Sequence, residues 1–146
     1  MRFGLTSLAN RHEAIDDVGV RIEAALLSGL AVLTACSSGP SAPKVTALDY
    51  SPMQLAVSVT ATISGTARFA DADGDVTQIV LGLVDPQGIL TEGSPKDTAS
   101  PGVLTGSVVF GLTVTPTQTG THSLSVRFVD GTGLSSAATL EPIDVR

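Results

Sequence analysis

Apolar and polar residues alternate along several stretches of the chain after residue 44. The clearest stretch runs from His122 to Val129, where one set of side chains is His122, Leu124, Val126 and Phe128 and the other is Ser123, Ser125 and Arg127. A period of two places successive side chains on opposite faces of a strand. The pattern therefore predicts a strand with one buried face.

Other stretches have the same character and are separated by turn-forming residues. The predicted strands span residues 45–49, 55–69, 76–84, 107–114 and 138–145, and the turns span 71–75, 85–88 and 130–133. In the long 55–69 stretch the odd-numbered residues are predicted to be buried, with a bend or bulge at Gly65. Residues 92–102 are predicted to form a loop, and Pro142 places the last strand at a sheet edge because proline cannot donate to a ladder.

No amphipathic helix is predicted after Cys36. Six or seven short strands at turn-punctuated intervals in about a hundred residues indicate an all-β fold, an antiparallel β-sandwich of about seven strands over residues 45–146.

Two motifs resemble segments of bacterial immunoglobulin-like domains, including the PKD-like and cadherin-like kinds. Residues 119–126 (TGTHSLSV) and 130–136 (DGTGLSS) look like the penultimate strand and its turn, and residues 70–76 (ADADGDV) look like the loop between the second and third strands. The resemblance implies an immunoglobulin-like sandwich. The chain departs from immunoglobulin domains proper because it has no Trp and a single Cys, and His122 stands in the place of the corner Tyr.

The region from Ile22 to Ala35 is apolar apart from Glu23, but it is shorter than the roughly 20 residues that span a bilayer. It matches the helical hydrophobic region of a secretory signal peptide, predicted here to be residues 1–35. The end of this region, Leu33, Thr34, Ala35 and Cys36, resembles the lipobox of bacterial lipoproteins. That resemblance implies that Cys36 is acylated and becomes the first mature residue, followed by a flexible tether over residues 36–44.

Residues 1–19 fit a signal peptide poorly because they contain Glu13, Asp16 and Asp17. We expect them to be an extension upstream of the true start at Val18 or Val20. The lipobox implies a cell-envelope protein anchored in a membrane by acyl chains, and Ser37 after the cysteine favours the outer membrane.

The charge of the chain limits its partners. After Cys36 there are five basic side chains against ten acidic ones, which disfavours binding to nucleic acid. With its single cysteine assigned to lipid, the domain forms no disulfide. The expected partners are the membrane and another envelope or surface protein.

Asp71, Asp73 and Asp75 form the most notable polar cluster, and the immunoglobulin-like topology would bring Asp130 to the same end. Alternating carboxylates on a tight loop can supply several of the six to eight oxygen ligands that calcium takes. The spacing is not that of an EF-hand. The alternative is that Asp and Gly are present because turns are made of them.

Catalysis has no positive support in the sequence. A Ser/His/Asp triad would have to use His122, which the alternation turns inward, and a glycosidase would need sugar-stacking aromatics, for which only Tyr50 remains. A polar cleft around His122 would favour an enzyme. The leading hypothesis is a lipid-anchored, non-catalytic module that binds proteins or mediates adhesion through its loops. The alternatives are a structural spacer and, least favoured, an envelope hydrolase.

Overall fold

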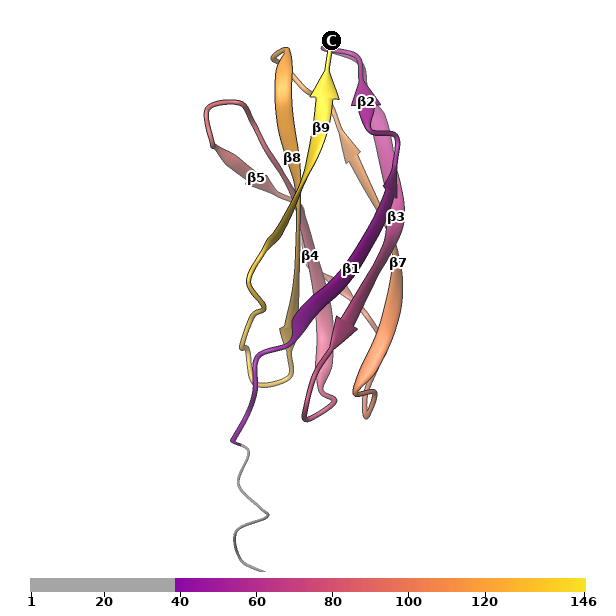
Figure 1. Cartoon of the computed structure of the whole chain (residues 1–146), viewed down its shortest axis with the longest axis vertical. Coiled ribbons are helices and arrows are strands. Elements are labelled where there is room, and N and C mark those ends of the chain that lie inside the picture. The colour runs from indigo at the N-terminus through magenta and orange to yellow at the C-terminus, as the bar shows by residue number, and fades with distance from the viewer. Residues whose placement is uncertain (1–38) are drawn as a thin grey trace, which may run out of the picture. The chain divides into compact units, whose positions relative to one another are not determined.

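Two β-sheets pack face to face in residues 39–146, the part of the chain that this computed structural model describes (Figure 1). The first sheet has the order β1-β3-β7, and its strands are Lys44–Ser51, Ala61–Ala70 and Thr105–Val114. The second sheet has the order β2-β9-β8-β4-β5, and its strands are Gln54–Leu55, Thr139–Val145, Gly120–Asp130, Val76–Val84 and Leu90–Glu92. A two-residue strand, β6 (Lys96–Asp97), also pairs with β4.

This topology is that of an immunoglobulin-like sandwich, as predicted. All strand pairs are antiparallel except β2 with β9, which is parallel. In a constant-type immunoglobulin sheet a fourth strand continues the sheet beyond the strand equivalent to β7. Among the described residues no strand pairs with that side of β7.

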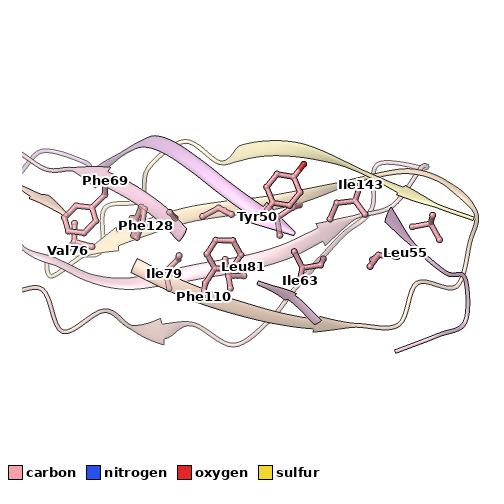
Figure 2. Close-up of a cluster of buried hydrophobic side chains, with 14 residues drawn as sticks. Tyr50, Leu55, Ile63, Phe69, Val76, Ile79, Leu81, Phe110, Phe128 and Ile143 are labelled. Atoms are coloured by element: carbon pink, nitrogen blue, oxygen red, sulfur yellow. The ribbon is translucent and has the colours of Figure 1, made fainter. Parts of the chain in front are cut away.

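The core lies between the sheets and is built from alternate residues of the strands (Figure 2). Phe69 of β3 and Phe128 of β8 pack against each other between the sheets, with their ring centroids 5.2 Å apart. The predicted inward set of β8 is confirmed, because His122, Leu124, Val126 and Phe128 are all buried. Since burying a Leu or Phe side chain contributes about 1.5–3 kcal/mol, this alternation is the main source of stability.

Tyr50 is part of this core. It was the only aromatic residue left as a candidate for stacking on sugars at the surface, and its burial removes that candidate. It is 7% exposed, and its hydroxyl donates a hydrogen bond to the carbonyl oxygen of Pro142, 2.7 Å away. Tyr50 therefore links β1 of one sheet to β9 of the other.

The predicted strand over residues 55–69 is two strands, β2 and β3, and the prediction of a bend at Gly65 was wrong. The chain breaks at 56–60, where Val57 N donates to Arg146 O (2.8 Å), Ser58 N donates to Pro116 O (2.7 Å), and Ser58 has φ of 60°. Val59 is consequently 53% exposed. Gly65 continues the ladder, and a Cβ there would clash with the backbone carbonyl oxygen of Asp49 and lie 2.8 Å from Phe110 Cζ, so the close approach of β1 and of this ring requires glycine.

The region predicted as a loop over residues 92–102 begins with structure that the pattern did not indicate. Both β5 and β6 pair with β4 and extend the second sheet beyond it. Val80 and Gly82, on the face of β4 opposite the core, are also buried, and a Cβ at Gly82 would lie 2.8 Å from Leu90 Cδ1 of β5.

Several predictions fall outside the described residues. They are the signal segment, the lipobox residues Leu33, Thr34 and Ala35, and the acylation of Cys36. Within the described residues, no helix has the length and apolar character needed to cross a membrane.

Candidate metal centre

The loop between β3 and β4 lies at one end of the sandwich, beside the turn that follows β8 (Figure 1). Gly131 N donates a hydrogen bond to Asp75 O across 2.8 Å, which holds the two loops together. Sequence reasoning placed these loops at the same end, and the hydrogen bond shows that they touch.

The carboxylates of Asp71, Asp73 and Asp75 converge in this loop. Each offers an oxygen atom, and these three atoms lie within 4.8 Å of one another. Asp71 is 4% exposed; its Oδ2 accepts the backbone N–H of Asp75 at 2.8 Å, whereas its Oδ1 is buried with no hydrogen-bond partner in the described part of the chain. Asp75 Oδ1 is buried without a partner as well. A buried polar atom left unpaired costs about 1–3 kcal/mol.

No salt bridge in the described part of the chain neutralises the negative charge of this group. The salt bridges within residues 39–146 join Arg127 to Glu92 and Arg146 to Asp144, and none reaches the three aspartates. Burial raises the pKa of Asp71 and the neighbouring Asp73 carboxylate raises it further, against the opposing effect of the Asp75 N–H. The charged form of Asp71 is thus disfavoured unless a cation lies nearby.

Ser41 is part of the site and was missed by sequence reasoning. Its backbone N donates to Asp73 Oδ2 at 3.0 Å and its hydroxyl to Asp73 Oδ1 at 3.1 Å. The Ser41 N–H is the main reason that the pKa of Asp73 is lowered. Nothing in the sequence marked this contact, because the two residues are 32 positions apart and Ser41 lies in a stretch that reads as a tether. Pro43 is fully buried, so the packed domain begins before β1.

Asp130 lies outside the group of three, although its backbone neighbour Gly131 contacts Asp75. Its Oδ1 accepts three hydrogen bonds of 2.8 Å, from Thr132 N, Thr132 Oγ1 and Leu134 N, and so closes the turn after β8. Its Oδ2 is buried without a partner among the described residues. The structure therefore gives Asp130 a role in the turn.

Carboxylate oxygens are the ligands that hard cations such as Ca²⁺ prefer. Three aspartates on a five-residue loop provide up to six such oxygens, and backbone carbonyls or water supply the rest of a calcium shell. The donor set and the unpaired Oδ1 atoms of Asp71 and Asp75 fit a divalent cation.

His122 lies next to a cavity of about 370 Å³ that is also lined by Asp85 and Glu92. Its Nδ1 lies 3.2 Å from Gly120 O, which matches the predicted structural role at the strand corner. Glu92 is engaged by Arg127, and Asp85 Oδ1 accepts the backbone N–H groups of Gln87 and Ile89. Among the described residues, no hydrogen bond joins His122 to a hydroxyl or carboxylate.

No protein-family model matches the sequence, and no curated protein matches it significantly. Solved structures do match. The PKD domain of a peptidase from a Thermoplasmatales archaeon has a TM-score of 0.47 at 18% identity and covers 73% of this chain and 98% of its own. The sporulation control protein Spo0M of Bacillus subtilis has a TM-score of 0.47 at 14% identity, over 73% of this chain and 50% of its own. The CARDB domain of a Pyrococcus furiosus protein, in complex with di-metal ions, has a TM-score of 0.46 at 15% identity and covers 75% of this chain and 90% of its own.

Proposed function

We propose that this chain is a non-catalytic immunoglobulin-like module of the bacterial cell envelope, anchored through acyl chains on Cys36, whose loop end is ordered by calcium bound to Asp71, Asp73 and Asp75. The observation that carries the metal site is the buried Asp71 Oδ1, which has no partner among the described residues and belongs to a group of three carboxylates that no described salt bridge neutralises.

Calcium would satisfy the unpaired oxygens of Asp71 and Asp75 in one step, and it would fix the loop between β3 and β4. Because Gly131 N is bonded to Asp75 O, the turn after β8 would be ordered with it. A rigid end built from two loops is the kind of surface through which a scaffold domain binds partners or mediates adhesion. Anchoring in the outer membrane would place this end of the domain in the cell envelope.

Thermal unfolding of the purified full chain in EDTA and in about 10 mM calcium tests the metal site. With a dissociation constant on the order of 0.1–1 mM, a tenfold excess of calcium stabilises the fold by roughly 1.4 kcal/mol. This corresponds to a rise in Tm of several degrees for a domain of about a hundred residues. The matched control is Asp97→Asn, an exposed carboxylate on β6, which should keep the full shift, whereas Asp73→Asn should lose most of it. Equal melting curves in EDTA and calcium would refute the site.

The anchor is tested separately, by labelling cells with a palmitate analogue. The wild-type chain should carry the label and Cys36→Ala should not. Label in both proteins, or in neither, would contradict acylation of Cys36 without bearing on the metal site. Crosslinking in intact cells, followed by identification of the neighbours, tests whether the module contacts another envelope protein.

A further inference from the structure

The outer edge of β7 is the longest strand edge that lacks a partner strand within residues 39–146. β7 ends the first sheet and pairs with β3 over all ten of its residues, from Ala61↔Val114 to Ala70↔Thr105, without a register shift. Its sequence, TGSVVFGLTV, contains no charge and no proline. A regular, uncharged edge of this kind is a template for pairing with another strand.

Alternate residues of β7 direct their backbone groups away from β3. In an antiparallel ladder a residue sends its N–H and C=O to the same side, and the next residue sends them to the other. Lys96 Nζ donates to Gly111 O at 2.8 Å, and the hydroxyls of Thr62 and Thr113 lie 3.1 Å apart, as expected for a close, non-hydrogen-bonded pair. Both observations indicate that Gly111 and Thr113 direct their backbone groups away from β3. Because the direction alternates along the strand, the outward residues are Thr105, Ser107, Val109, Gly111 and Thr113.

The middle residue of this outward set is Val109, which is 82% exposed. It is the most exposed large hydrophobic residue in the described part of the chain. Lys96 occupies one acceptor, the Gly111 carbonyl, and no other hydrogen bond to the outward backbone groups is found among the described residues.

The other sheet edges are protected in ways that β7 is not. β1 carries Lys44 and Asp49 and an irregularity between Val45 and Ala47. β5 has three residues, and β2 has two. Charges, bulges and short length are the features that prevent edge pairing.

We propose that β7 pairs antiparallel with β7 of a second copy of this chain, about a two-fold axis at Val109, to join two three-stranded sheets into one of six strands. This register places all five outward residues opposite one another, with Val109 opposite Val109, Ser107 opposite Gly111 and Thr105 opposite Thr113. The Ser107–Gly111 pair requires Lys96 Nζ to leave the Gly111 carbonyl oxygen. No charged side chain of β7 enters the interface, because β7 has none. The identical strand is thus a complementary partner, as a two-fold interface requires.

The area buried by one strand pair sets the strength of this dimer. Stable interfaces bury about 1,200–2,000 Å², and a single pair of strands buries less. The dimer is therefore weak and concentration-dependent in solution. Anchoring copies in one membrane would raise their effective concentration and favour it.

Sedimentation velocity of the full chain in mild detergent, over a hundredfold range of concentration, tests the proposal. The background is Cys36→Ser, so that lipid and native thiol play no part. The parent chain should shift from monomer to dimer with concentration. Val109→Lys places like charges opposite each other at the axis and should abolish the shift. Leu140→Lys, at an exposed site on β9, is the matched control and should dimerise like the parent.

Oxidative crosslinking of single cysteines locates the interface. Cα atoms of a hydrogen-bonded pair lie about 5.5 Å apart, within the range of a disulfide. Val109→Cys should crosslink several-fold more than Leu140→Cys. A parent chain that stays monomeric, a Val109→Lys variant that dimerises normally, or equal crosslinking at both sites would overturn the proposal. If the parent is monomeric, the remaining candidate for pairing with this edge is a strand of another protein.

Discussion

The hydroxyl of Tyr50 donates a hydrogen bond to the carbonyl oxygen of Pro142, and this bond joins the first strand of one sheet to the last strand of the other. The chain has no disulfide to make such a link, because it has one cysteine. Replacing Tyr50 with Phe keeps the ring and removes the bond. We expect Tyr50→Phe to lower the free energy of unfolding by about 1 kcal/mol in urea denaturation. An unchanged midpoint would show that the bond contributes nothing.

The same residue predicts a change of stability at alkaline pH. Burial, and then the charge of Glu141, raise the pKa of Tyr50 above its usual value. The fold therefore favours the neutral phenol, so its contribution is complete below pH about 10 and is lost as pH rises through the raised pKa. The free energy of unfolding, measured from pH 8 to 11, should fall more steeply for the wild type than for Tyr50→Phe. Parallel curves would contradict the shift.

Gly65 and Gly111 provide a matched pair of glycine substitutions on neighbouring strands. A Cβ at Gly65 would clash with the backbone carbonyl oxygen of Asp49 and lie 2.8 Å from Phe110 Cζ, whereas one at Gly111 would meet Thr62 Cγ2 at an ordinary 3.8 Å. We expect Gly65→Ala to destabilise the fold by about 1–3 kcal/mol through overpacking. Gly111→Ala should be close to neutral in the same denaturation experiment. Equal effects would mean that the core adjusts to the added methyl group.

Asp71→Asn should have opposite effects with and without calcium. Without metal, the wild type bears the cost of a buried charge whose pKa is raised, and this cost grows as pH rises through that pKa. The amide removes the charge and adds a donor beside Asp73. Its Tm should exceed that of the wild type by a few degrees in EDTA at pH 7, and the order should reverse in calcium. A lower Tm for Asp71→Asn in EDTA would contradict this account.

Asp130→Ala tests the turn after β8 apart from the metal. The substitution leaves the N–H groups of Thr132 and Leu134 without their acceptor, which costs about 1–3 kcal/mol. Because Asp130 lies outside the group of three, the loss should be the same in EDTA and in calcium. If the variant instead loses the calcium-dependent rise in Tm, Asp130 is a ligand.

The sequence pattern was most informative where one face of a strand is buried and the other is solvated. In β8 the period of two identified the buried His122, Leu124, Val126 and Phe128, but it placed Ser125 on the opposite face, and Ser125 is buried as well. It failed at Val57 and Ser58, whose N–H groups bond to Arg146 and Pro116, because partners so distant in sequence leave no local signal. β5 and β6 were missed for the same reason, since their pairing with β4 decides their structure.

The candidate site was predictable to a similar extent. The alternation of Asp71, Asp73 and Asp75 along one loop was enough to predict that their carboxylates meet. The burial of Asp71 and the contact of Ser41 with Asp73 depend on packing between distant segments, so the sequence could not indicate them.

The contact between Ser41 and Asp73 also determines where the domain can be truncated. A recombinant protein that starts at Lys44 would retain every strand but lack both donors that Ser41 gives to the Asp73 carboxylate. Asp73 would then lose the two hydrogen bonds that orient its carboxylate, and its pKa would rise toward the usual value. Metal affinities measured on such a trimmed domain would describe the same three aspartates without the contacts that orient Asp73 in the whole chain.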